Sequence, residues 1–293
     1  MRPAPFDYRA PDTLDEALAV LGDAADDVSV LAGGQSLVPM LNMRIARPDL
    51  VLDLGRIAEL TGVERRNGVL RIGAMTRQRA VETDPTVRAQ LPLLPAALRH
   101  VAHLAIRTRG TIGGSLVHAD PSAELPAAVA ALEGRVELRA AAGARVLALE
   151  DFLLGPLMTA RAPGELLAAV EIPVPAPGTG WGFAEVASTH GAFALAGAAA
   201  VLRLDRPGGV VEHVRLTLLG VAGTPVTPDW VAPALAGRPP AEEALAEVGA
   251  RLRDTLEPRD DAQVSAAYRR RAAVELAVRV LRDAARRAEG QAP

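Results

Sequence analysis

The sequence contains no cysteine among its 293 residues. Disulfides, thiolate metal sites, iron–sulfur clusters and cysteine nucleophiles all need that side chain, so the chain itself can supply none of them. If the protein takes part in redox chemistry, its redox group therefore has to be a bound cofactor or to belong to a partner.

Long apolar runs and concentrated positive charge are also missing. No segment approaches the roughly 18 apolar residues of a membrane span, because the richest stretches, at 125–132 and 193–204, are short and rich in alanine. The N-terminal segment carries Asp and Pro where a signal peptide needs an apolar stretch, so we expect a cytoplasmic protein. The net charge is −3 and no block of basic residues is long enough to neutralise a run of phosphates, which argues against nucleic acids and membrane surfaces as partners.

What remains is the composition of a folded globular chain. Hydrophobic residues make up 49% and charged residues 23%, which excludes wholesale disorder. A chain of this length is expected to form about two domains.

The first part of the chain alternates predicted helices and short strands. Thr13 and Glu16 form a capping box for a helix that ends at Gly22. Strands are expected at 28–31, 50–54, 69–72 and 166–172, with a hairpin over 135–149 that turns at Gly143. Helices are expected at 76–83, 93–105 and 124–133, with a shorter one between the first two strands.

A segment rich in proline and glycine, 173–178, marks the strongest compositional break. It can continue neither a helix nor a central strand, so we predict two domains, residues 1–176 and 177–293. The first is expected to divide into subdomains at about 1–55 and 56–176. In the second, strands at 183–187, 193–204 and 210–221 predict one antiparallel sheet, followed by helices at 242–256 and 260–289.

Two turns with paired glycines stand out, Ala-Gly-Gly-Gln-Ser at 32–36 and Thr-Ile-Gly-Gly-Ser at 111–115. Glycine permits positive φ and leaves no Cβ in the way, so successive N–H groups can converge on an anion such as a diphosphate. Ser36 can cap the following helix and Ser115 can donate its hydroxyl. Paired glycines also occur where a tight turn alone requires them, and both interpretations stay open. The spacing matches neither the Rossmann fingerprint nor the P-loop.

Longer motifs surround these turns. They read Ala-Gly-Gly-Gln-Ser-Leu-Val-Pro-Met-Leu-Asn-Met-Arg at 32–44, Arg-Pro-Asp-Leu-Val-Leu-Asp-Leu at 47–54, Ile-Arg-Thr-Arg-Gly-Thr-Ile-Gly-Gly-Ser-Leu-Val-His-Ala-Asp-Pro-Ser-Ala-Glu-Leu-Pro at 106–126 and Ser-Ala-Ala-Tyr-Arg-Arg-Arg-Ala-Ala-Val-Glu-Leu at 265–276. The sequence resembles, over nearly its whole length, the FAD-binding medium subunit of the molybdenum hydroxylase (xanthine dehydrogenase) family. The resemblance is strongest to the flavoprotein subunit of aerobic carbon monoxide dehydrogenase.

The resemblance implies an α+β fold and a set of cofactor-binding residues. The fold would be the two-part, PCMH-type FAD domain shared with vanillyl-alcohol-oxidase-like flavoproteins, followed by a small antiparallel sheet plus helices. Glu124 would suit a ribose hydroxyl, and main-chain groups of both turns would hold the diphosphate. The full set of implied FAD-binding residues is Ala32, Gly33, Gly34, Gln35, Ser36, Leu37, Thr111, Ile112, Gly113, Gly114, Ser115, His118, Glu124 and Phe193.

The same resemblance implies a flavoprotein component of a multisubunit oxidoreductase. A large subunit would carry the molybdenum cofactor, a small subunit would carry [2Fe–2S] clusters, and FAD would pass electrons to a terminal acceptor. The family's usual assembly is a dimer of heterotrimers. Two alternatives are a self-sufficient flavin oxidoreductase, for which no base is evident, and a non-enzymatic scaffold paralogue.

Individual side chains leave several choices open. Relatives carry Gly-Asp-Tyr or Gly-Asp-Phe where this chain has Gly-Ala-Phe at 191–193, so Phe193 either covers a flavin face or belongs to the second core. His118 is either a cofactor contact or a turn residue. His100 and His103, one helical turn apart, lack a third metal ligand. We therefore predict no metal site and no catalytic residue.

Overall fold

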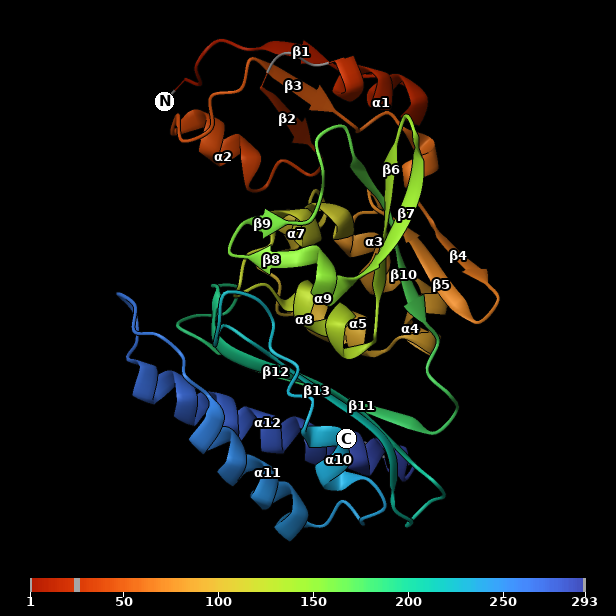
Figure 1. The fold of residues 1–293 in the computed structure, drawn as a ribbon, viewed down its shortest axis with the longest axis vertical. Coiled ribbons are helices and arrows are strands. Elements are labelled where there is room, and N and C mark those ends of the chain that lie inside the picture. Colours follow the sequence, from red (N-terminus) through yellow and green to blue (C-terminus); the bar gives the residue numbers. More distant parts are fainter. Residues whose placement is uncertain (1, 24–26, 292–293) are drawn as a thin grey trace.

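The computed structural model describes residues 2–23 and 27–291, and its N-terminal part is a small parallel sheet between two helices (Figure 1). Strand β3 pairs with β1 on one side and with β2 on the other. The apolar face of α1 packs on this sheet, as its spacing predicts, and Glu16 N–H donates to Thr13 Oγ1 at 3.3 Å. The elements are β1 (Asp7–Arg9), α1 (Leu14–Asp23), β2 (Val28–Leu31), α2 (Leu37–Asn42) and β3 (Leu50–Asp53).

A five-stranded antiparallel sheet in the order β4-β5-β10-β6-β7 forms the middle of the molecule. A group of short helices packs on it around a core of aliphatic side chains and Phe152. The strands are β4 (Val63–Arg66), β5 (Val69–Gly73), β6 (Arg135–Ala140), β7 (Gly143–Ala148) and β10 (Leu166–Pro173), with a separate pair β8 (Leu153–Gly155) and β9 (Met158–Thr159). The helices are η1 (Ala58–Leu60), α3 (Gln78–Thr83), α4 (Pro85–Gln90), α5 (Leu93–Leu98), α6 (Leu104–Arg107), α7 (Ile112–His118), α8 (Glu124–Ala131) and α9 (Leu149–Phe152).

The C-terminal part is a three-stranded antiparallel sheet with helices on both faces (Figure 1). Its central strand shows why: Ala196, Ala198 and Ala200 face the core shared with α11 and α12, whereas Ala199 and Val201 belong to the core of the middle part. The elements are β11 (Thr179–Ala187), β12 (Ala194–Leu204), β13 (Val211–Leu219), α10 (Val231–Leu235), α11 (Glu242–Thr255) and α12 (Ala266–Ala288).

Two glycines let α12 lie directly on β11. A Cβ at Gly180 would come within 2.5 Å of Ala288 N, and one at Gly182 within 2.9 Å of Val280 Cα. Because main chain faces main chain here, no side chain can move aside to make room.

Most strands and helices agree with the sequence-based prediction, including the antiparallel C-terminal sheet. The single helix predicted over 93–105 is wrong, because the chain breaks between α5 and α6, with Ala102 at φ 41°. The last helix begins at Ala266 rather than 260, since Ser265 Oγ accepts from Tyr268 N–H at the N-cap. Helix α4 was missed although Asp84 caps it and Pro85 is its first residue. The tight turn predicted at 111–115 is wrong, because Thr111 is the N-cap of α7 and Ile112 to Ser115 form the first turn of that helix. Within the residues that the structure describes, none of the helices has the length and apolar character needed to cross a bilayer.

Candidate cofactor-binding site

The two glycine turns, far apart in sequence, lie against each other. A Cβ at Gly33 would stand 2.5 Å from Arg109 O and 2.7 Å from Gly110 Cα, at the entrance to the second turn. A Cβ at Gly114 would stand 3.4 Å from Ala32 Cβ. The turns 32–36 and 111–115 therefore form one surface, which we call the glycine cradle.

The first turn, between β2 and α2, leaves its main-chain donors open. Across the described parts of the chain, none of the N–H groups of residues 32–36 donates a hydrogen bond to a protein atom. Gly34 has φ +74°, and Ser36 makes no side-chain cap bond to α2. These residues are half-buried rather than fully exposed. The first turn thus offers consecutive unpaired donors, the chemistry that an anionic group requires.

The second turn, by contrast, uses its main-chain donors within the protein. Ile112 N–H donates to Thr76 O, Gly113 N–H to Ala74 O at 2.9 Å, and Gly114 N–H to Thr111 Oγ1 at 3.0 Å. Thr111, Ile112 and Gly113 are buried, whereas Gly114 and Ser115 are half-buried. A Cβ at Gly113 would collide with Ala74, so close packing accounts for this glycine. The second turn therefore forms a rigid side of the cradle and contributes the Ser115 hydroxyl. The free main-chain donors belong to the first turn.

Glu124 lies at the start of α8, where α7 has just ended in a tight turn. Ala119 adopts φ 51°, and Asp120 Oδ1 accepts from Ser122 N–H at 2.8 Å. Glu124 is only 7% exposed, and burial raises its pKa to about 8, with smaller contributions from the charges of Glu185 and Asp120. At neutral pH the group is a carboxylic acid that can donate a hydrogen bond. His118, the last residue of α7, is half-buried beside this turn.

Phe193 lies in the loop between β11 and β12 and is 67% exposed. It therefore does not belong to the second core, since β12 begins at Ala194, which packs on Ala127 of α8. The loop rests on the break between α5 and α6, because a Cβ at Gly191 would stand 3.0 Å from Ala102 C. The Phe193 ring is thus free to cover a ligand.

A buried ion pair stabilises the break between α5 and α6. Arg107 Nε donates to Glu82 Oε2 at 3.1 Å, and Arg107 Nη1 donates to Val101 O and Ala102 O. Desolvation acts to raise the pKa of Glu82, but hydrogen bonds from Arg79 and Arg107 outweigh it and hold that pKa below its ordinary value. The sequence alone gave no reason to single out Glu82.

Another pair that the sequence did not reveal is formed by His100 and Glu185, with 3.4 Å between Nδ1 and Oε1. His100 follows α5, while His103 is the N-cap residue of α6 and makes no side-chain cap bond, so the two histidines do not share a helix face. Across residues 2–23 and 27–291, no three His, Asp or Glu side chains are arranged to hold a metal ion.

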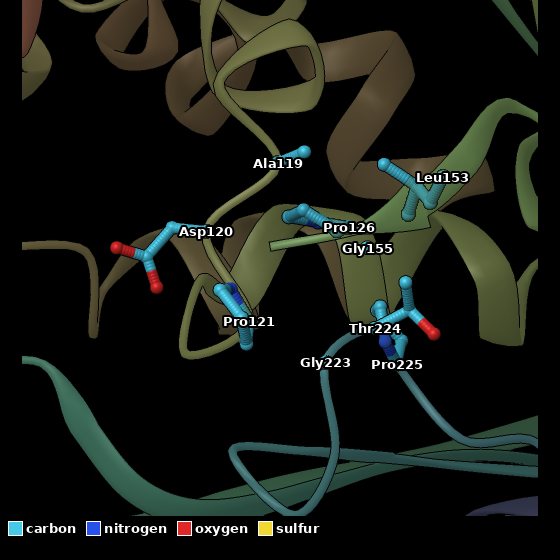
Figure 2. A pocket seen from close by; sticks show the side chains of 9 residues that line it. All are labelled: Ala119, Asp120, Pro121, Pro126, Leu153, Gly155, Gly223, Thr224 and Pro225. Atoms are coloured by element: carbon cyan, nitrogen blue, oxygen red, sulfur yellow. The ribbon is translucent and has the colours of Figure 1, made fainter. Parts of the chain in front are cut away.

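A shallow depression lies beside the turn between α7 and α8, and it has no room for a water molecule (Figure 2). Prolines, Leu153 and the 223–225 loop line it, and Figure 2 shows Asp120 directed away from Pro126 and Leu153. Since Asp120 already caps its own turn, this pocket adds no reactive group to the cradle.

Comparison with known proteins covers nearly the whole chain. Residues 4–175 match the family described as FAD binding domain in molybdopterin dehydrogenase, and residues 181–284 match the CO dehydrogenase flavoprotein C-terminal domain. The chain is 40% identical to the caffeine dehydrogenase subunit beta of a Pseudomonas species, over 98% of this chain and 97% of that one. It is 35% identical to the carbon monoxide dehydrogenase medium chain of Hydrogenophaga pseudoflava, over 96% and 97%. A solved carbon monoxide dehydrogenase from that organism, lacking the Mo-pyranopterin moiety of its molybdenum cofactor, matches with a TM-score of 0.93 at 36% identity, over 97% of this chain and 98% of that one.

Proposed function

The chain belongs to the family of FAD-binding medium subunits of multisubunit molybdenum hydroxylases, which are oxidoreductases, and on this premise we propose that it binds FAD at the glycine cradle. The observation that carries the placement is the row of unpaired N–H groups over residues 32–36. A diphosphate needs several donors at once. Gly33 lets the first turn pack on the main chain of Arg109, and Gly34 adopts the positive φ that this turn requires.

Bound FAD supplies the electron-transfer chemistry, and the residues of this chain bind and orient it. The first turn, Ala32 to Leu37, would hold the diphosphate, while Ser115 would donate its hydroxyl from the wall formed by 111–115. The protonated Glu124 would donate to an oxygen of the cofactor or accept from its ribose, with His118 close by. Phe193 would cover the flavin by stacking.

The same premise favours a particular assembly. The relatives' names describe medium and beta subunits, and the solved relative is a carbon monoxide dehydrogenase described as lacking the Mo-pyranopterin moiety of its molybdenum cofactor. With no cysteine in this chain, iron–sulfur ligands have to come from another polypeptide. We therefore propose a large molybdenum subunit and a small [2Fe–2S] subunit as partners, in a dimer of heterotrimers located in the cytoplasm. We also propose 1–176, with parts at about 1–55 and 56–176, as the FAD-binding domain and 177–293 as the second domain.

The experiment is to purify the chain, alone and co-expressed with its partner subunits, and to identify the cofactor released on denaturation from the visible absorption spectrum. We expect stoichiometric FAD. A protein that is colourless in both states and takes up no added FAD would contradict the proposal.

A variant pair places the site. Gly33→Val is uninformative because its side chain would strike the main chain of Arg109. Gly114→Val is preferable, since its nearest obstacles are side-chain atoms of Thr111 and Ala32. We expect FAD binding at least about tenfold weaker, about 1.4 kcal/mol, with the folded state retained by circular dichroism. Gly22→Val, with open space around its Cβ, is the matched control and should bind FAD normally. Unchanged binding in Gly114→Val would place the cofactor elsewhere.

A further inference from the structure

The carboxylate of Asp53 lies at the end of strand β3, next to the first glycine turn. Asp53 is the register partner of Leu31, the last residue of β2, and Leu54 N–H donates to Leu31 O at 3.0 Å. Ala32, the first residue of the turn, follows directly. The pairing of β2 with β3 thus brings Asp53 to the row of free N–H groups, although the proposed function gives it no role.

Two hydrogen bonds fix the Asp53 carboxylate without using up its acceptor capacity. The Tyr8 hydroxyl donates to Asp53 Oδ2 at 2.7 Å, and Gly55 N–H donates to Oδ1 at 2.8 Å. A carboxylate can accept about four hydrogen bonds, so each oxygen has room for a further donor. Asp53 is only half-buried and both bonds lie at the surface, so a ligand can reach the group.

The connectivity around Asp53 is that of a dinucleotide-binding unit. Strand β2, a glycine turn, helix α2 and the parallel neighbouring strand β3 follow one another (Figure 1). Asp53 ends the second of these strands, 20 residues after Gly33. In Rossmann units an acidic residue about 20 residues beyond the glycine turn binds a ribose hydroxyl, because ligands lie outside the carboxyl ends of parallel strands. The glycine spacing differs from the Rossmann fingerprint, but the acid has the same place relative to the turn.

The turn and the carboxylate require different chemical groups from a ligand. The free N–H groups of residues 32–36 favour an anion. A carboxylate repels an anion and needs hydrogen-bond donors instead. A ligand that satisfies both therefore carries a phosphate next to a sugar with free hydroxyl groups. The adenosine diphosphate half of FAD has this composition.

The flavin half of FAD is assigned elsewhere by the proposed function. Phe193, which would cover the flavin, lies in the loop between β11 and β12, and this loop rests on Ala102 in the middle part of the molecule. Asp53 belongs to the N-terminal sheet. Because the diphosphate joins the two halves of FAD, a diphosphate at the glycine cradle leaves the adenosine half for the N-terminal sheet.

Resting on the proposed function, we propose that Asp53 binds the ribose of the adenosine half of FAD and accepts hydrogen bonds from its hydroxyl groups. Tyr8 and Gly55 hold the carboxylate in position, and the first turn binds the adjoining diphosphate. Glu124, which follows the second turn, is then left to contact a different part of the cofactor. The site therefore distinguishes FAD from FMN, which has no adenosine half.

The test measures flavin affinity by fluorescence titration of the FAD-stripped protein, or of the FAD-stripped complex if the chain needs its partners. The two ligands are FAD and an FAD analogue that lacks the adenosine 2′-hydroxyl group. We expect the wild type to prefer FAD at least about tenfold, since a hydrogen bond to a charged group contributes that much. In Asp53→Asn the preference should fall below about threefold, because one neutral amide oxygen, which also accepts from Gly55 N–H, replaces two charged oxygens.

The matched control is Asp49→Asn, at the end of β3 away from the first turn. Asp49 Oδ2 accepts from Asp27 N–H at 3.2 Å, so this variant alters a similar contact and should keep the wild-type preference. FMN is the second control, and its affinity should be the same in wild type and Asp53→Asn. If Asp53→Asn fails to fold, Asp53→Ser decides, because a serine hydroxyl can still accept from Gly55 N–H.

An unchanged preference in Asp53→Asn would overturn the proposal, since a carboxylate that only caps its turn does not sense the ribose. Equal losses for FAD and FMN would also contradict it, because they would place the flavin half at Asp53. If FMN binds too weakly to measure, the comparison of FAD with its deoxy analogue decides. A wild-type protein that binds no FAD would refute the proposed function itself. One that binds FAD and the analogue equally well would refute only the ribose assignment.

Discussion

Glu124 is a carboxyl group enclosed by protein at the first turn of α8, and its titration couples to folding. Its pKa is about 8 in the folded chain, against 4.5 ordinarily. The folded state thus holds a proton that the unfolded chain has lost, so stability falls as pH rises from about 4.5 to about 8 and is level above that.

We expect Glu124→Gln to remove this pH dependence in the FAD-free protein. At about 1.4 kcal/mol per pKa unit, the wild-type free energy of unfolding should change by up to several kcal/mol across this pH range. Urea unfolding at pH 5.5, 7 and 8.5 measures it. Glu247→Gln, an exposed residue paired with Arg238, is the control and should keep the wild-type slope. Parallel curves for Glu124→Gln and wild type would show that the carboxyl is ionised in the folded protein.

The ion pair of Glu82 and Arg107 supports a second prediction at this scale. Glu82→Gln leaves the buried guanidinium of Arg107 without its counter-charge, so we expect a loss of about 3–5 kcal/mol in the free energy of unfolding. Glu212→Gln, which breaks the exposed pair with Arg203, should change stability by less than about 1 kcal/mol. Equal effects in chemical denaturation would mean that Arg107 finds other partners.

The two Gly-Gly motifs can be found from the local sequence, but the reason for their glycines cannot. A Cβ at Gly33 would meet Arg109, and one at Gly113 would meet Ala74, and both neighbours are distant in the sequence. The pairing of His100 with Glu185 was not predictable, since only the tertiary fold brings the end of α5 to β11. The hydrogen bonds donated by the N–H groups of Ile112 and Gly113 were not predictable either, because their acceptors on Thr76 and Ala74 are distant in the sequence.

Among whole elements, the contact between α12 and β11 makes the sharpest prediction. A Cβ at Gly182 would meet the main chain of Val280, so Gly182→Ala has to push helix and strand apart. We expect a loss of about 3 kcal/mol in unfolding free energy. Gly22→Ala adds the same methyl group in open space on α1 and should raise stability by up to about 1 kcal/mol. Thermal unfolding compares the two variants. If both raised or both lowered the stability, the result would contradict the close packing of α12 on β11.

Periodicity predicted the elements well where one face is buried, as in α1 and the strands of the C-terminal sheet. It failed at 93–105 because the side chains there are suited to a helix, while the break is imposed from outside. Arg107 binds the carbonyls of Val101 and Ala102, and the loop carrying Gly191 occupies the corner. Gly191 comes from a distant part of the chain, and the bonds of Arg107 to carbonyls five and six residues away leave the hydrophobic pattern unchanged.

At the scale of the whole molecule, the C-terminal sheet completes the core of the middle part. Ala199 and Val201 belong to that core, and α8 packs on β12 and β13. The proposed division after residue 176 therefore separates architectures rather than independent folding units.

We expect the fragment 1–176 to aggregate or remain partly unfolded, because the faces of α5 and α8 lose their cover. The full chain should unfold in a single transition. Size-exclusion chromatography and circular dichroism test the pair. A monomeric fragment that unfolds cooperatively would contradict the shared core.

Strand β12 has a consequence for how this chain can vary. Ala196, Ala198, Ala199 and Ala200 are fully enclosed, with helices on either side of the sheet. In a saturation mutagenesis library these positions should accept little beyond glycine and serine, while many charged loop positions accept most residues. The alanine-rich segment of β12, which carries no recognisable motif, is thus where substitutions are most restricted.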